Sequence, residues 1–207
     1  MLDREYHEYS PFAVSAASVP EPVPSGIVSD LEWQIQRMAE NLQLCDGLVH
    51  AQFILTEEGK PVIIEVCRRS PGDLYIDFVK YSTGVDYPGM IVSCEAGRKM
   101  EIKPVCDSNS TSRLTVPQGH DMNTRVKGFW GRHVVACRRE GRLKDIIIDG
   151  RLAPYIYEKV ISFEKGREIK VDEIYKCGVL ILKFQNQEEM ETVMSHASEY
   201  IEYVMER

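Results

Sequence analysis

Apolar residues in the first half of the chain follow both helical and extended patterns. Over residues 30–44 they recur at the spacing of one helix face, and Ser29 and Glu32 form a capping-box sequence at the start of this segment. Residues 48–55 and 61–67 are two short apolar runs separated by a polar segment that contains glycine, which predicts a β-hairpin. The first half is therefore expected to combine helices with antiparallel strands.

Two short helices are expected after this hairpin. Residues 74–82 have helical spacing, with Asp73 placed as the N-cap and Gly84 placed to end the helix. Asp86 then precedes a second short helix that is expected to reach Glu95. Aspartate and glycine are the residue types that these helix ends favour, which supports both boundaries.

The second half of the chain predicts a β-rich region. Asn186 is expected to cap a closing helix whose apolar face extends to Val204. The pattern as a whole is α+β, with a first domain at residues 1–104 and a β-rich subdomain at residues 105–207 that ends in this helix. The short apolar runs expected to form strands are Arg113–Val116, His133–Cys137, Asp145–Ile148, Tyr155–Val160 and Val179–Phe184.

Composition is that of a folded soluble protein. The 207 residues are 43% hydrophobic and 28% charged, an ordinary balance for a globular chain. No apolar run approaches the ~18 residues that a membrane span needs, and the N-terminus lacks the apolar core of a signal peptide. The six cysteines contain no C-x-x-C pair, which argues against a structural zinc site. We therefore expect a cytoplasmic protein with no membrane partner.

Charge argues against a protein held to nucleic acid by phosphate contacts. The chain has 25 Lys and Arg against 32 Asp and Glu, a net charge of −7. Residues 121–144 are locally basic, and Phe129 and Trp130 lie among them. An RNA-binding surface from Arg125 to Lys144 is a minor alternative, and a solvated sheet rim or a surface for an anionic substrate is favoured.

The predicted hairpin carries polar side chains in the middle of apolar strands. A four-residue turn would place Thr56 opposite Pro61. The same register sets Gln52 opposite Glu65, so that an amide and a carboxylate project side by side from neighbouring strands. Amide and carboxylate oxygens on a rigid platform suit a hard cation such as Mg²⁺. The hairpin is therefore the candidate metal site.

Positive charge follows directly on the second strand of the hairpin. Arg68 and Arg69 suit a phosphate or a carboxylate. A buried ion pair between Glu65 and Arg69 that only stabilises the hairpin is an equally weighted alternative. Cys67 shares the face of Glu65 by strand alternation, and its use as a nucleophile is a minor alternative.

The same hairpin resembles part of a known family. Residues 47–55 (GLVHAQFIL) and 62–69 (VIIEVCRR) resemble the paired strands of the C-terminal lobe of ATP-grasp enzymes, especially carbamoyl-phosphate synthetase large chains and phosphoribosylglycinamide synthetases. In that family the strands read roughly G-x-x-x-x-[EQ]-F and then I-E-x-N-P-R. Residues 81–87 (YSTGVDY) resemble the helix and turn that follow, and the resemblance is good over residues 44–97.

The resemblance implies specific roles for five residues. Gln52 matches the first metal ligand, Glu65 the second, and Cys67 occupies the position of the third. Arg69 matches the catalytic arginine that meets the phosphate or the substrate, and Arg68 is a weaker contact to the nucleotide. The implied cofactors are ATP and Mg²⁺, with Mn²⁺ as an alternative metal.

The chain departs from the family pattern in two ways. Cys67 stands where the family has asparagine, and a thiol is a soft ligand that suits Mg²⁺ poorly. The sequence also has no glycine-rich phosphate loop. We therefore expect the C-terminal lobe of an ATP-grasp domain, a fragment that is inactive without an N-terminal half.

The reaction implied by the resemblance is an ATP-dependent ligation. ATP would phosphorylate a small carboxylate substrate, and an amine or a thiol would displace phosphate from the acylphosphate. A catalytically degenerate binding or assembly module with the ATP-grasp fold is the alternative. A homodimer formed through the apolar stripe of the closing helix is a minor alternative to packing of that stripe in the core.

Overall fold

The computed structural model describes residues 1–45, 47–98 and 126–206, which form an α+β structure of antiparallel sheets and helices, as the sequence predicts. These residues form three sheets, of five, three and two strands. No helix in the described part of the chain is long and apolar enough to cross a membrane. The four α-helices are α1 (Ser25–Asn41), α2 (Tyr75–Thr83), α3 (Tyr87–Glu95) and α4 (Gln187–Met194).

The five-stranded sheet is the centre of the fold and takes strands from both ends of the chain. All of its strand pairs are antiparallel. The expected domain boundary at residues 104 and 105 and the expected strand at 113–116 lie outside the described residues. In order across the sheet, the strands are β1 (Arg4–Tyr6), β2 (Ala16–Val19), β5 (Phe129–Cys137), β9 (Tyr175–Phe184) and β7 (Ile156–Ile161).

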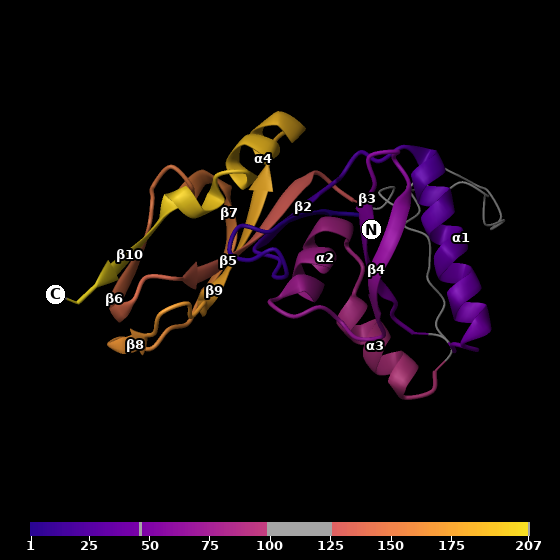
Figure 1. Cartoon of the computed structure of the whole chain (residues 1–207), viewed down its shortest axis with the longest axis horizontal. Coiled ribbons are helices and arrows are strands. Elements are labelled where there is room, and N and C mark those ends of the chain that lie inside the picture. Colours follow the sequence, from indigo (N-terminus) through magenta and orange to yellow (C-terminus); the bar gives the residue numbers. More distant parts are fainter. Residues whose placement is uncertain (46, 99–125, 207) are drawn as a thin grey trace.

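Two smaller sheets lie toward opposite ends of the molecule (Figure 1). One is the hairpin of β3 (His50–Leu55) and β4 (Pro61–Cys67), against which α1 packs. The other has β6 (Gly141–Ile148) between β8 (Arg167–Ile169) and β10 (Ile201–Met205). Two short 3₁₀ helices, η1 (Ala153–Tyr155) and η2 (Ala197–Tyr200), precede β7 and β10.

Helices cover both faces of the five-stranded sheet. Along β9, Leu180 and Leu182 pack in one cluster with α4, whereas Val179 and Ile181 pack in a second cluster with Phe78 of α2. This alternation follows from the two-residue repeat of a strand. Burial of side chains of this size contributes about 1.5–3 kcal/mol each. Strand β9 therefore contributes side chains to the core on both faces of the sheet.

Helix α1 begins earlier than the capping box predicts. Its first turn starts at Ser25, and the carbonyl of Pro24 accepts hydrogen bonds from Ile27 N and Val28 N at 3.0 and 3.3 Å. The N-cap makes no side-chain hydrogen bond, so the prediction of a cap at Ser29 is wrong. Burial of Val28 anchors the additional turn against the rest of the protein.

The ends of α2 agree with the sequence only at its C-terminus. Gly84 ends the helix in the left-handed conformation with a φ of 74°, as predicted. At the start, Leu74 is the N-cap and no side chain caps the helix. Asp73 fails as a cap because its carboxylate binds Lys176 Nζ instead, at 2.7 Å. Asp86 does occupy the N-cap position of α3, although its side chain makes no capping hydrogen bond.

The closing helix is shorter than predicted, and the described chain ends in a strand. Asn186 caps α4 as expected, with its Oδ1 accepting from Glu189 N at 2.9 Å. The helix then stops at Met194, and the prediction of a continuous helix to Val204 is wrong. The last residues form β10, which pairs with β6. The expected strands from residue 133 onward overlap β5, β6, β7 and β9, whereas β8 and β10 were not predicted.

Candidate functional site

The register of the hairpin places Gln52 directly opposite Glu65, as the sequence predicts. Near the turn the prediction is wrong, because Pro61 lies opposite Leu55 rather than Thr56. One extra residue of β4 forms a bulge between these two regions and restores the predicted pairing. A bulge bends its strand and redirects side chains, and bulges are common beside active sites. The amide and the carboxylate are therefore neighbours on the hairpin.

Four of the five predicted site residues line one cavity. Its volume is about 250 Å³, and Gln52, Glu65, Cys67 and Arg69 all contribute to its wall. The hairpin supplies three of these side chains, and the segment after β4 supplies the arginine. His50 of the hairpin and polar side chains from other parts of the chain complete the wall, the latter being Glu5, Asp73, Tyr75, Arg132 and Lys176.

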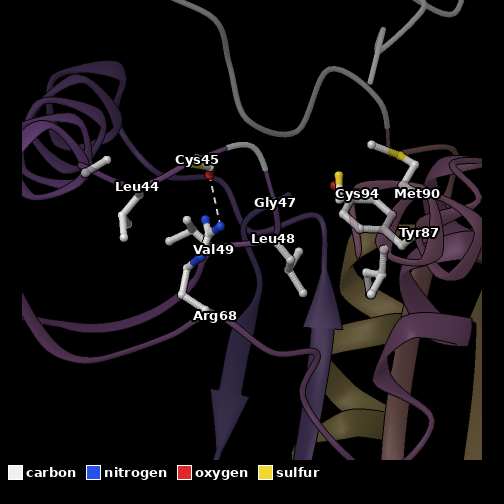
Figure 2. A pocket seen from close by; sticks show the side chains of 11 residues that line it. Leu44, Cys45, Gly47, Leu48, Val49, Arg68, Tyr87, Met90 and Cys94 are labelled. Carbon is white, nitrogen blue, oxygen red and sulfur yellow. Dashed lines mark hydrogen bonds between the residues drawn. The ribbon is translucent and has the colours of Figure 1, made fainter. Parts of the chain in front are cut away.

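Arg68, the fifth predicted residue, lies at a different cavity. Its Nη2 donates to the carbonyl of Cys45 at 2.9 Å, and Figure 2 shows the side chain pointing toward that carbonyl. Gly47 packs closely against it, since a Cβ atom there would come within 2.6 Å of Nη2. This cavity has a volume of about 470 Å³, with Tyr87 and Cys94 of α3 on its far side (Figure 2). The structure does not bring Arg68 together with the other four residues.

The alternative of a buried ion pair between Glu65 and Arg69 is wrong for the described structure. Among the described residues, no carboxylate lies within 4.0 Å of the Arg69 guanidinium. Arg69 Nη1 donates to the carbonyl of Ser70 at 3.1 Å, and Glu65 is exposed. Both charged groups are therefore available to a ligand in the cavity.

Gln52 is oriented by a carboxylate that the sequence did not single out. Its Nε2 donates to both carboxylate oxygens of Glu5, at 2.9 and 3.0 Å. Because the amide nitrogen is held by Glu5, the carbonyl oxygen of Gln52 is the atom left to accept a hydrogen bond or bind a cation. Glu5 lies 47 residues away on β1, so no local pattern connects the two.

Cys67 and His50 form a second pair on the hairpin. The distance from Cys67 Sγ to His50 Nδ1 is 3.4 Å, and the two residues are register partners on β4 and β3. Burial lowers the pKa of His50 despite the opposing effects of nearby Glu5 and Glu65. The imidazole is therefore mainly neutral at neutral pH. The register that pairs Gln52 with Glu65 also pairs these two, so the signal for this pair was present in the sequence.

Arg132 is the buried cation of the cavity. Its side chain comes from the middle of β5, and the residue is 3% exposed. Nη1 donates to the carbonyl of Asp73 at 3.1 Å, and the guanidinium carbon lies 5.5 Å from the centre of the Tyr75 ring. Burial lowers the pKa of Arg132. The sequence had placed it only in a generally basic stretch.

The remaining basic residues of that stretch do not form an RNA-binding surface with Trp130. Trp130 is 3% exposed and packs against Tyr81 and Tyr157, so it is not available to stack on bases. The described lysines and arginines other than Arg132 are exposed and lie on β6 or beside β5 and β6, and Arg125 lies outside the described residues. The stretch is a solvated rim with one buried member.

The side chains of the cavity can supply only part of the coordination shell of Mg²⁺. Within the described residues, no group of three or more His, Cys, Asp or Glu side chains is arranged to hold a metal ion. Gln52 and Glu65 supply two hard oxygen donors, whereas the Cys67 thiol is soft and contacts His50. Mg²⁺ commonly binds through one or two protein groups, with water and substrate phosphates as the other ligands. The residues fit a metal that a nucleotide brings with it.

No protein-family model and no curated protein matches the sequence. Solved structures do match its fold. An L-amino acid ligase from Bacillus licheniformis superposes with a TM-score of 0.67 at 15% identity, over 95% of this chain and 45% of that one. Phosphoribosylglycinamide synthetase from Anaerococcus prevotii gives a TM-score of 0.68 at 17% identity, over 99% and 48% of the two chains.

A third match extends the set to carboxylases. The biotin carboxylase domain of the 2-oxoglutarate carboxylase from Hydrogenobacter thermophilus, in complex with MgADP and bicarbonate, gives a TM-score of 0.61 at 15% identity, over 93% of this chain and 40% of that one. These proteins are ATP-grasp enzymes, so the fold is the one that the sequence resemblance predicts. The chain spans less than half the length of each.

Proposed function

We propose that this chain is the C-terminal part of an ATP-grasp ligase that joins a small carboxylate substrate to an amine or a thiol through an acylphosphate. The observation that carries the proposal is the placement of Gln52, Glu65 and Arg69 in one cavity of a chain with the ATP-grasp fold. Such phosphoryl transfer depends on positioning and charge stabilisation, which these residue types supply.

Each residue has a distinct role in this proposal. Glu65 and the carbonyl oxygen of Gln52 hold Mg²⁺, or Mn²⁺ in its place. The metal supplies positive charge that neutralises the phosphate oxygens of ATP. Arg69 binds the transferred phosphoryl group or the acylphosphate through its guanidinium. Cys67 occupies the third ligand position but contributes least, because its thiol is a soft donor.

We further propose that a preceding half of the enzyme completes the nucleotide site. The chain spans less than half the length of its structural neighbours. The hairpin also exposes apolar side chains that a neighbouring lobe would cover. The exposed fractions are 53% for Ile54, 48% for Leu55, 43% for Val62 and 59% for Ile64. The isolated chain is accordingly not expected to turn over ATP.

Mg²⁺-dependent binding of ATP to the full-length protein tests the proposal. Isothermal titration calorimetry should show binding that Glu65→Gln weakens at least about 10-fold, equivalent to about 1.4 kcal/mol. Glu58→Gln is the matched control, because Glu58 is exposed in the turn of the same hairpin and the charge change is identical. Equal affinity of wild type and Glu65→Gln would refute the proposed metal site.

A binding or assembly module that has lost catalysis is the second candidate. The observation that favours it is Cys67, a soft ligand that contacts His50 at 3.4 Å instead of offering a hard oxygen. Such a module would bind no Mg·ATP in the full-length protein even though Gln52 and Glu65 are intact. Under either proposal we place the protein in the cytoplasm, since the five described cysteines are all free thiols.

A further inference from the structure

The Arg132 guanidinium is buried and makes no direct ion pair, although the carboxylates of Asp73, Asp3 and Glu5 lie near enough to stabilise its charge. Among the described residues it forms no ion pair within 4.0 Å, and its one hydrogen bond is from Nη1 to the Asp73 carbonyl. Its Nε is buried and has no hydrogen-bond partner. A buried charge is costly unless it is paired, and a buried donor without an acceptor adds to that cost.

The contacts that Arg132 does make compensate its charge only in part. The Tyr75 ring lies under the guanidinium at 5.5 Å, and the Asp73 carbonyl supplies a dipole rather than a charge. Arginine stays protonated in proteins, so neutralisation does not relieve the cost. Arg132 lines the 250 Å³ cavity. An anion that enters the cavity would supply an acceptor for the unpaired Nε–H of Arg132.

The other two cations of the cavity, Arg69 and Lys176, are exposed, whereas Arg132 is buried. Lys176 Nζ binds the Asp73 carboxylate at 2.7 Å, and Arg69 donates to the Ser70 carbonyl. The backbone around the Arg132 acceptor is itself constrained, because Asp73 and Leu74 both have a φ of 57°. Non-glycine residues adopt this conformation at a cost, and such residues cluster at ligand sites.

The size of the cavity limits the ligand. Pockets for drug-sized ligands have volumes of about 300–1,000 Å³, and this one is smaller. A planar guanidinium with two parallel N–H groups matches a carboxylate. The cavity therefore suits a small acid.

We infer that Arg132 binds one carboxylate of a small substrate that carries two carboxylates. The carboxylate at Arg132 does not react, and the second carboxylate is the reactive group. The substrate class is accordingly a dicarboxylic acid or an acidic amino acid, held by one carboxylate at Arg132 while the other is activated beside Gln52 and Glu65. The identity of the activated carboxylate rests on the proposed ligase function. Binding of the first carboxylate at Arg132 does not.

NMR of the Arg132 Nε–H group in the full 207-residue chain tests this assignment directly, with succinate as the probe and without ATP or Mg²⁺. Succinate should shift the Nε resonance saturably, and inorganic phosphate at equal ionic strength should shift it less. An unchanged Nε resonance at saturating succinate would overturn the proposal. A shift caused by phosphate alone would make the site a phosphate subsite and would overturn it as well.

Variants provide an independent readout by calorimetry. Arg132→Gln should weaken succinate binding at least about 10-fold, whereas Arg142→Gln, with the same charge change at an exposed position on β6, should leave it unchanged. Arg132→Lys keeps the positive charge but removes the two parallel N–H groups of the guanidinium, so it should also weaken succinate binding. If Arg132→Gln and Arg142→Gln weaken succinate binding equally, the loss of affinity would come from the change in net charge alone, and the proposed site would be refuted. Because the titration contains no nucleotide, failure of the ligase proposal would leave its outcome unaffected.

Discussion

Cys67 Sγ lies 3.4 Å from His50 Nδ1 on the hairpin that also carries Gln52 and Glu65. Cys67 is the residue that the sequence resemblance assigns to the third ligand position, and its thiol contacts an imidazole whose pKa is lowered by burial. A hard cation gains little from either group. The proposed metal site would therefore have two oxygen donors on the hairpin, and we expect it to bind Mg²⁺ weakly.

Cys67→Asn should strengthen Mg²⁺ binding in the full-length protein. The substitution replaces a soft thiol with an amide oxygen beside Glu65, and hard cations prefer oxygen. We expect the Mg²⁺ concentration for half-maximal ATP binding to fall by about 3-fold or more, about 0.7 kcal/mol at RT ≈ 0.59 kcal/mol. Cys94→Asn, at the separate cavity beside Arg68, is the control and should change nothing. An unchanged Mg²⁺ requirement in Cys67→Asn would remove Cys67 from the metal site.

Native alkylation should distinguish Cys45 from Cys137 and Cys177. Cys45 is exposed, whereas Cys137 and Cys177 are buried at 0% exposure. Burial raises the pKa of Cys177 to about 11 and also raises that of Cys137. The thiolate is the reactive form, so both buried thiols should resist iodoacetamide at pH 7.5 while Cys45 reacts. Peptide mapping by mass spectrometry measures this, and labelling of Cys177 as fast as Cys45 would contradict the packing of β9.

The pairing of Gln52 with Glu65 could be predicted because a short turn fixes which residues of β3 and β4 face each other, whereas the pairing of His50 with Cys67 was missed although the same register contains it. The predicted register was wrong by one residue at Pro61, and the pairing at Gln52 is correct only because a bulge in β4 compensates for that error. Arg132 could not be found in this way. Its partner Asp73 is 59 residues distant, and only assembly of the five-stranded sheet brings them together.

The prediction of a helix to Val204 was wrong for a different reason. Residues 197–204 have apolar side chains at positions that fit both a helical and a two-residue repeat. In the structure Ile201, Tyr203 and Met205 pack against the core and Glu202 is exposed, which is the repeat of a strand. Pairing with β6 decides between the two patterns, and that partner lies more than 50 residues earlier in the chain.

Two buried titratable groups should make opposite contributions to stability below neutral pH. Burial lowers the pKa of His133 from 6.5 to about 4, so its contribution is present above pH 6.5 and is lost as the pH falls toward 4. Burial raises the pKa of Asp3 from 3.8 to about 6, so its contribution is present below pH 3.8 and is lost as the pH rises toward 6. Each shift corresponds to about 3 kcal/mol, and the two largely cancel between pH 4 and 6.

Asp3→Asn should make the contribution of His133 to the pH dependence of stability measurable on its own. Asparagine does not titrate, so the variant should lose stability more steeply than wild type between pH 6 and pH 4, with a difference of up to about 3 kcal/mol. Urea unfolding at the two pH values measures it. Because both proteins share every other titrating group, parallel pH profiles would show that Asp3 is ionised in the folded protein.

Gly178→Ala should strongly destabilise the five-stranded sheet. Gly178 has a φ of 154° at the bulge of β9, and a Cβ atom there would overlap the backbone carbonyl oxygen of Val160 on β7. The backbone cannot move aside as a flexible side chain can, so we expect a loss of about 2–4 kcal/mol in the free energy of unfolding. Gly150→Ala is the control, because nothing lies within 4 Å of its Cβ position. If urea denaturation finds the two variants equally stable, the close pairing of β7 with β9 at this point is wrong.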